Sequence, residues 1–213
     1  MKRKYTNNYD KIAPVYDLLS RLVYFNAQRS AQINQLIFLQ PNSRILIIGG
    51  GTGWILEAIT KRYNAGLEIV YVEISRKMMQ LAKSRNYGNN QVLFLEKDLA
   101  DYHCDTKFDV VMTAFLFDNF TTKQTKNAFP QIDSLLGKSG LWLYCDFYLN
   151  TEKGKWWKSA MIKMMYFFFR TFGMVETNNL IDMYPYFAAY NYIKKEESFY
   201  YHSFIQSIVY TKV

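Results

Sequence analysis

The chain has 213 residues, a length that fits one domain with a sizeable core. Half of the residues are hydrophobic and 18% are aromatic, which excludes a disordered chain. The net charge of +8 favours anionic surroundings, but the lysines and arginines are spread along the chain, so we expect no dedicated nucleic-acid site.

The first elements in the chain are predicted helices over residues 5–39, which precede a strand. Four apolar residues, Ile45 to Ile48, run into a glycine cluster that ends at Gly53, and a helical pattern follows. This order predicts a buried parallel strand, a tight turn and a helix start. Glycines in such a turn let backbone N–H groups approach a ligand beside the positive end of a helix dipole.

The glycine pattern limits which ligand the turn can hold. A phosphate-binding P-loop needs Lys-Ser/Thr after its last glycine, but Trp54 and Ile55 follow Gly53 here. The dinucleotide pattern G-x-G-x-x-G would place Trp54 at its third glycine, which argues against a dinucleotide. The pattern present is G-x-G-x-G, and it suits a ligand without phosphate that lies against the loop backbone.

The second strand supplies a carboxylate to the same edge of the sheet. Residues 67–73 read LEIVYVE and end at Glu73. Glu73 follows the loop by about twenty residues, the spacing at which an acidic side chain accepts hydrogen bonds from ribose hydroxyls. An adenosine ligand without a diphosphate is indicated, and S-adenosylmethionine is the common one.

The remaining pattern alternates strands and helices. Ser75 is predicted to cap a helix that runs to about Arg85. The other predicted elements are a turn over 86–90, strands over 91–95 and 108–113, a helix over 121–136 that ends at Gly137, a strand over 141–145 opened by Gly140, and a terminal hairpin over 192–201 and 204–211. We therefore expect an α/β fold with a doubly wound, mostly parallel sheet and an antiparallel C-terminal hairpin.

Several stretches together resemble the class I S-adenosylmethionine-dependent methyltransferases. They are ILIIGGGTG, YVEISRKMMQLAK, FLEKDLADY and FDVVMTAFLFDNF. The N-terminal NNYDKIAPVYDLLSRLV is similar to the segment that covers the cofactor in the ubiquinone/menaquinone C-methyltransferases. One position departs from the family pattern, because Ile47 stands where an acidic residue is usual.

The resemblance implies a seven-stranded Rossmann-like methyltransferase fold and S-adenosylmethionine as cofactor, with S-adenosylhomocysteine as product. It assigns the ribose to Glu73, one adenine face to Ile74, the adenine amino group to Asp98 and the methionine end to Ala114. The full set of expected cofactor contacts is Tyr9, Tyr16, Gly49, Gly50, Gly51, Thr52, Gly53, Glu73, Ile74, Met78, Asp98, Leu99 and Ala114.

Methyl transfer needs alignment and exclusion of water more than a fixed catalytic group. The candidates are Asp118, Asp146 and Tyr16. Asp118 is alternatively an N-cap, Asp146 a satisfied turn carboxylate, and Tyr16 a core residue. Asp17 and the nearby Asp10 are expected to be helix-surface charges.

Residues 154–172 form a strongly apolar predicted helix. Ser159, Lys163, Tyr166 and Arg170 give it a narrow polar stripe. Three interpretations stay open: a core helix, a lid over an apolar substrate cavity, and peripheral contact of 155–172 with an anionic membrane through Lys158, Lys163 and Arg170. The lid is narrowly favoured. We expect one domain over 1–213, with an N-terminal helical cap over 1–40 and the lid within 151–180.

The favoured function is methylation of a small, largely apolar or aromatic metabolite. A non-catalytic cofactor-binding module and an RNA or protein methyltransferase are the alternatives. The latter is weakened because residues 114–117 lack the N/D-P-P-Y/F motif of base-amino methyltransferases. Cys104 and Cys145 are expected to be reduced, which suits the cytoplasm, and no metal site is expected because His103 and His202 stand alone.

Overall fold

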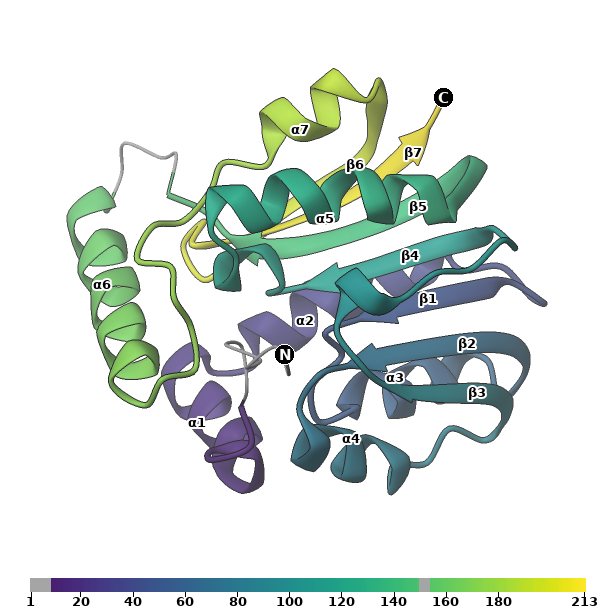
Figure 1. Ribbon diagram of the computed structural model, residues 1–213, viewed down its shortest axis with the longest axis horizontal. Helices are drawn as coiled ribbons and strands as arrows, with labels where there is room; N and C mark the ends of the chain where they lie inside the picture. The colour runs from purple at the N-terminus through teal and green to yellow at the C-terminus, as the bar shows by residue number, and fades with distance from the viewer. Residues whose placement is uncertain (1–8, 150–153) are drawn as a thin grey trace.

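The computed structural model describes residues 9–149 and 154–213. A seven-stranded sheet runs through the molecule in the order β3-β2-β1-β4-β5-β7-β6. Strands β1 to β5 pair in parallel, whereas β7 is antiparallel to both β5 and β6. Helices cover the sheet on both sides (Figure 1). The predicted α/β fold with a reversed C-terminal hairpin is confirmed.

The strands are β1 (Arg44–Ile48), β2 (Ala65–Glu73), β3 (Asn89–Glu96), β4 (Phe108–Ala114), β5 (Leu136–Phe147), β6 (Tyr192–Tyr200) and β7 (Ile205–Lys212). The α-helices are α1 (Ala13–Tyr24), α2 (Ala27–Ile33), α3 (Trp54–Arg62), α4 (Arg76–Lys83), α5 (Thr122–Leu135), α6 (Lys155–Thr171) and α7 (Tyr184–Ala189). Short 3-10 turns are η1 (Asn34–Phe38), η2 (Leu99–Asp101) and η3 (Phe117–Asn119).

The alternation of side chains along each strand divides the core between the two faces of the sheet. In β1, Leu46 and Ile48 pack with Phe129 of α5 on one face. Ile45 and Ile47 pack on the other face with residues of η1, α3 and α4. Because β1 is buried on both faces, its sequence is a continuous apolar run rather than an alternating one.

Strand β5 is longer than expected. It begins at Leu136, directly after α5, and not at Leu141. The pairing with β4 shifts register between Phe108 and Val110, and a Cβ on Gly140 would lie 2.7 Å from the Leu136 side chain. The two glycines that suggested a loop therefore serve an irregular turn within the strand.

Helices α1 and α6 lie side by side at the carboxyl ends of the parallel strands (Figure 1). The Tyr24 hydroxyl of α1 lies 3.8 Å from the Met165 sulfur of α6. A third apolar cluster, which includes Tyr24, Ile162 and Tyr166, joins both helices to the ends of β5 and β7. These helices therefore enclose the edge of the sheet where a ligand is expected.

Candidate functional site

A cavity of about 710 Å³ opens at the carboxyl ends of the strands, beneath α1 and α6. The predicted site residues that line it are Tyr9, Tyr16, Gly49, Gly50, Gly51, Thr52, Glu73, Ile74, Met78, Asp98, Leu99, Ala114 and Asp118. Residues from both halves of the chain thus meet at one cavity, as expected for parallel strands whose ends share an edge.

The glycine loop needs its glycines for different reasons. Gly49, Gly51 and Gly53 have positive φ angles of 65°, 62° and 76°. A Cβ on Gly50 would lie 2.3 Å from Cζ of Tyr71, so the ring of Tyr71 leaves no room for a side chain there. A Cβ on Gly51 would meet no atom within 4 Å, which shows that backbone faces open space there. The loop therefore fits a ligand that rests on bare main chain.

Gly53 is one of two predicted site residues outside the described cavity wall. It precedes α3, and a Cβ there would lie 2.6 Å from Cα of Ala82 in α4. Gly53 was expected to contact the cofactor. In the structure it lies where the glycine loop packs closely against α4. Trp54 and Ile55, which follow Gly53, line the cavity again, so the expected contact of Gly53 with the cofactor stays a prediction.

Glu73 connects the tip of β2 to the loop. Its carboxylate accepts hydrogen bonds from the backbone N–H groups of Gly51 at 2.9 Å and Ser75 at 2.8 Å. Burial raises the pKa of Glu73, and the two N–H groups partly oppose that rise. The Tyr71 hydroxyl donates to the Gly51 carbonyl at 3.0 Å. Ile47, at the position where the family usually has an acid, is buried and lines the cavity.

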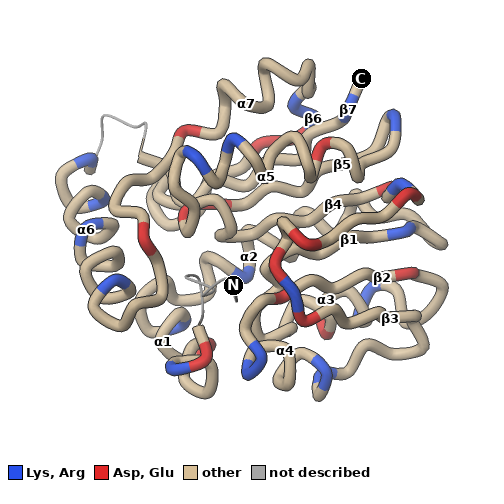
Figure 2. The backbone as a smooth tube through the Cα atoms, in the orientation of Figure 1, with Lys and Arg blue, Asp and Glu red and all other residues tan. Residues whose placement is uncertain are grey.

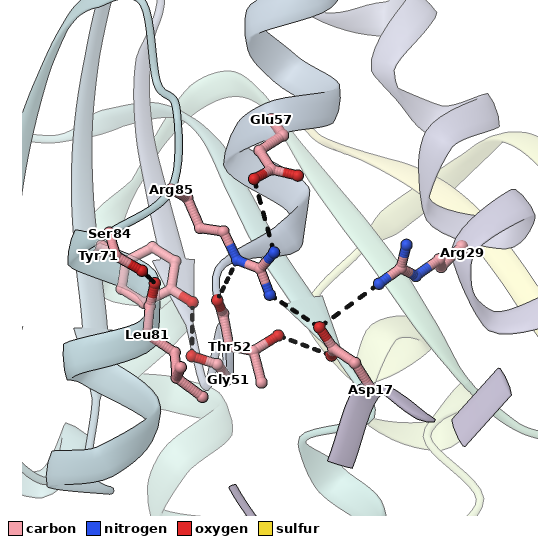
Figure 3. Close-up of polar contacts among 9 residues, drawn as sticks. All are labelled: Asp17, Arg29, Gly51, Thr52, Glu57, Tyr71, Leu81, Ser84 and Arg85. Atoms are coloured by element: carbon pink, nitrogen blue, oxygen red, sulfur yellow. Dashed lines mark hydrogen bonds and ion pairs between the residues drawn. The ribbon is translucent and has the colours of Figure 1, made fainter. Parts of the chain in front are cut away.

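Asp17 was expected to be a surface charge, and this expectation is wrong. Its carboxylate accepts hydrogen bonds from the Thr52 hydroxyl and from the Arg85 guanidinium, both at 2.8 Å (Figure 3). Arg29 of α2 lies 3.5 Å from the same carboxylate, and Arg85 also donates to the Thr52 carbonyl at 3.0 Å. Asp17 thereby ties α1 to the glycine loop.

Asp10 is likewise not a simple surface charge. Its Oδ1 accepts from the Ser75 hydroxyl at 2.6 Å and from the Lys77 backbone N–H at 3.0 Å, so it supports the start of α4. Ser75 itself caps α4 as predicted, because its hydroxyl accepts from the Met78 N–H. The available signal was the repeat of a Tyr-Asp dipeptide at residues 9–10 and 16–17. Asp17 lies in α1, whereas Asp10 lies in the turn before it.

Asp118 lies on the cavity wall within η3. Burial raises the pKa of its carboxyl to about 7. Its Oδ1 accepts from the Asn119 amide at 2.8 Å, and the Tyr9 hydroxyl donates to Asn119 Oδ1. The N-cap interpretation of Asp118 is wrong, because Thr121 caps α5 through a capping box with Gln124.

Asp146 lies at the end of β5, as predicted, but it does not belong to the described cavity wall. Its Oδ1 accepts from the Phe147 N–H at 2.8 Å, and its Oδ2 has no hydrogen-bond partner among the described residues. Burial, together with the nearby Asp118 carboxylate, raises the pKa of Asp146. One carboxylate oxygen of Asp146 is therefore paired within the turn and the other is not, and a catalytic role for Asp146 stays a prediction.

Tyr16 does line the cavity, with its ring 5.9 Å from that of Tyr9 in an edge-on arrangement. Burial raises the pKa of the Tyr16 hydroxyl, and the Asp118 charge adds to the rise. The hydroxyl therefore stays protonated near neutral pH and can donate a hydrogen bond but not act as a base.

Asp98 ends the third strand region, as expected. Its Oδ1 accepts from the Ala100 N–H at 3.0 Å and begins η2, while the residue lines the cavity beside Leu99. Gln131 of α5 donates to the carbonyls of Leu99 and Tyr102, which fixes this turn.

One wall of the cavity is apolar and comes from α6. Its side chains there are Met161, Met164, Met165, Phe168 and Phe169. The predicted polar stripe of this helix is wrong in one member, because Tyr166 is buried and donates to the Asp118 carbonyl at 2.9 Å. Tyr166 therefore holds α6 against η3 rather than facing solvent.

A row of glutamines was missed by the sequence analysis. Gln28, Gln32 and Gln35 also line the cavity. Gln35 donates to the carbonyls of Tyr144 and Ile208, so it attaches the N-terminal helices to β5 and β7. Their spacing of four and three residues was the available signal, since it places them on one helix face.

The sheet order, the glycine loop and the carboxylate at the tip of β2 together define a Rossmann-like methyltransferase fold. Solved structures agree: the magnesium protoporphyrin IX methyltransferase of Synechocystis aligns with 89% of this chain and 84% of its own at a TM-score of 0.65 and 16% identity. A SAM-dependent methyltransferase from Aquifex aeolicus aligns with 96% and 98% at a TM-score of 0.66 and 12% identity.

Sequence comparisons point the same way. A family model described as a methyltransferase domain matches residues 45–140. A ubiquinone/menaquinone biosynthesis C-methyltransferase of Wigglesworthia glossinidia brevipalpis is 30% identical over 65% of this chain and 57% of its own length. A demethylmenaquinone methyltransferase of Thermus thermophilus is 36% identical over 53% and 52%.

Residues 45–140 therefore match a methyltransferase-domain family, and the chain shares its fold with S-adenosylmethionine-dependent methyltransferases of known structure. The chain spans about half the length of the curated relatives it matches.

Proposed function

We propose that the protein transfers a methyl group from S-adenosylmethionine to a small, largely apolar or aromatic metabolite. The observation that carries this proposal is the continuity of one cavity. The glycine loop and Glu73 line one part of it, and the methionine and phenylalanine side chains of α6 line another. Polar groups that suit a nucleoside and an apolar wall thus share one cavity, which is the arrangement that a donor and an apolar acceptor need.

The residues present fit the cofactor. Gly51 offers bare backbone beside open space, and Glu73 offers a buried carboxylate at the strand tip for the ribose hydroxyls. Ile74, Met78, Leu99 and Asp98 would surround the adenine, with Ala114 near the methionine end. Tyr9 and Tyr16 would close the site from the N-terminal side.

When bound, S-adenosylmethionine supplies a methyl group on a sulfonium centre, which departs by in-line displacement. The chain contributes position and shelter: α1, held by Asp17, and α6, held by Tyr166, would cover the bound donor and acceptor. If the acceptor carries a proton that must leave, Asp118 is the group on the wall that can take it, because its pKa of about 7 leaves the carboxylate available near neutral pH.

The apolar cavity wall formed by α6 indicates the chemical class of the methyl acceptor. Methionine side chains adapt to irregular apolar shapes, and aromatic rings stack on planar groups. The relatives include proteins named as quinone C-methyltransferases. We therefore propose an aromatic ring with apolar substituents, of the demethylated quinone kind, as the substrate class.

The test is methyl transfer from labelled donor to fractionated acceptors. Label is expected in the apolar small-molecule fraction with the wild-type protein. Asp118→Asn is expected to lower the rate at least tenfold if a proton leaves the acceptor. Label in the RNA or protein fraction would overturn the proposed substrate class, and absence of label in every fraction would favour a binding module.

A further inference from the structure

Helix α1 presents an apolar face to the outside of the molecule. Its exposed residues Val15, Leu18, Leu19, Leu22 and Val23 follow the spacing of a single helix face. Leu22 is 65% exposed, and Phe25, which ends the helix, is 70% exposed. Asp17, the only acidic residue of α1, lies on the inner side, where it contacts Thr52 and Arg85 (Figure 3).

Helix α6, which lies beside α1, also presents an apolar face to the outside of the molecule. Trp156 is 80% exposed and Phe167 is 74% exposed, and Met164, Phe168 and Phe172 are also exposed. The spacing of Trp156, Met164 and Phe167 places these side chains along one outer face. We call the exposed apolar residues of the two helices the rim surface. It consists of Val15, Leu18, Leu19, Leu22, Val23, Phe25, Trp156, Met164, Phe167, Phe168 and Phe172.

The rim surface is continuous with the cavity. Leu19 and Val23 of α1 and Met164 and Phe168 of α6 are exposed, and all four also line the cavity. These residues therefore form the edge of its opening. An apolar molecule that leaves an apolar phase at the rim surface would enter the cavity without crossing water.

The exposed charged residues on α1 and α6 themselves are basic, although Glu176, in the segment after α6, is also exposed. Helix α6 contains four basic residues and no acidic one, and Lys155, Lys163 and Arg170 are exposed. The expected contact of Lys158 with lipid is wrong, because Lys158 is buried and donates to the Ser203 carbonyl at 3.2 Å. Arg21 is exposed on α1. Figure 2 shows the basic positions distributed along the length of α6. Exposed apolar side chains flanked by lysine and arginine match the interface of an anionic bilayer, where the apolar groups enter the acyl boundary and the cations meet the headgroups.

We propose that the rim surface docks on an anionic lipid bilayer and that the cavity opens toward the membrane. No helix among residues 9–149 and 154–213 is long and apolar enough to cross a membrane, so the contact is peripheral. Docking stands independently of catalysis. Entry of a lipid-soluble acceptor from the bilayer rests on the proposed function.

The experiment is sedimentation of the cofactor-free protein with vesicles. One set contains phosphatidylglycerol and phosphatidylcholine in equal parts, and the other contains phosphatidylcholine alone. Binding is expected to the anionic vesicles, at least tenfold tighter than to the neutral ones, and to weaken with salt.

Two pairs of variants separate the apolar and the charged contributions. Trp156→Gln with Phe167→Gln is expected to weaken binding about tenfold, whereas Leu93→Gln, at an exposed leucine of β3, leaves it unchanged. Lys163→Glu with Arg170→Glu is expected to abolish the preference for anionic vesicles. The matched control is Lys123→Glu with Lys126→Glu on α5, which makes the same change in net charge.

A spectroscopic readout is independent of sedimentation. Trp156 emission is expected to shift to shorter wavelength on anionic vesicles, and Trp156→Phe is expected to lose that part of the shift while still binding. Equal binding to both vesicle types, binding unaffected by the rim variants, or a stable dimer that buries Trp156 and Phe167 would each overturn the proposal. Vesicle binding without affinity for S-adenosylmethionine would overturn the proposed function instead and leave the docking surface standing.

Discussion

At the scale of single residues, two side chains of β2 determine how the glycine loop sits. Tyr71 and Glu73 are two positions apart, so both point to the same face of the sheet. Tyr71 fills the space beside Gly50 and donates to the Gly51 carbonyl, while Glu73 accepts from the Gly51 N–H. The N–H and the carbonyl of Gly51 are therefore both hydrogen-bonded to side chains of β2. Ile47, at the position where the family usually has an acidic residue, contributes no charge to the loop.

Gly50→Ala is the substitution that tests this packing. The added methyl would overlap the Tyr71 ring, so we expect a loss of about 1 to 3 kcal/mol of unfolding free energy and a loss of donor affinity. Gly51→Ala is the comparison, because its Cβ meets open space and only its φ of 62° is unfavourable, at roughly 1 kcal/mol. Urea unfolding and calorimetry measure both. Equal stability of Gly50→Ala and the wild type would contradict the role assigned to Tyr71.

Asp118 gives a prediction for stability against pH. Its pKa is about 7 in the folded protein and near 4 when unfolded, so the folded state holds the proton more tightly. The resulting stabilisation is complete below the unfolded pKa and is lost as the pH rises through about 7. We expect urea unfolding to show a fall in stability between pH 5 and pH 8. Asp118→Asn should reduce that fall, and an unchanged slope would show that Asp118 titrates normally.

The same group predicts the pH dependence of the reaction. A carboxyl that accepts a proton from the acceptor must be ionised, so kcat/KM is expected to rise with pH and level off above about 7. Asp118→Asn should remove this rise together with most of the rate. A profile that is flat for the wild-type protein would mean that no proton leaves through Asp118.

At the scale of elements, periodicity located every strand, since β1, β2 and β4 are largely buried apolar runs, and β1 stops at a glycine and β2 at Glu73. The start of β5 was missed because Gly137 and Gly140 serve a turn inside a strand, which the pattern cannot distinguish from a loop. The aspartates of the N-terminal segment were misjudged for another reason. Their partners, Thr52, Ser75 and Arg85, are 35 or more residues away and become neighbours only in the folded sheet.

Asp17→Asn tests whether α1 depends on this contact. The uncharged amide cannot form ion pairs with Arg85 and Arg29. We therefore expect a loss of roughly 1 to 2 kcal/mol of unfolding free energy and faster hydrogen exchange in α1. Donor affinity should fall as well, since the helix closes the cofactor side of the cavity. Asp105→Asn, on an exposed loop, is the control and should change neither quantity. Unaltered exchange in α1 would indicate that apolar packing alone holds the helix.

At the scale of the whole molecule, residues from positions 9 to 169 meet at one edge of the parallel sheet, beside α1 and α6. The sequence was sufficient for the fold class and for the glycine-loop and strand-end residues of the cavity wall, because the alternation of strands and helices places those residues at one edge of a parallel sheet. It was not sufficient for Asp146, whose orientation depends on the packing of η3 against β5. Nor was it sufficient for the outer face of α6, since apolar residues alone do not show which side is buried.

The central claim is that a phosphate-free nucleoside is held by Glu73 and the bare loop. Isothermal titration calorimetry with S-adenosylmethionine and S-adenosylhomocysteine tests it most directly. We expect binding of both ligands by the wild-type protein and by Glu68→Ala, an exposed carboxylate in the same strand, and no measurable heat with Glu73→Ala. No binding by the wild-type protein, or undiminished binding by Glu73→Ala, would contradict the claim.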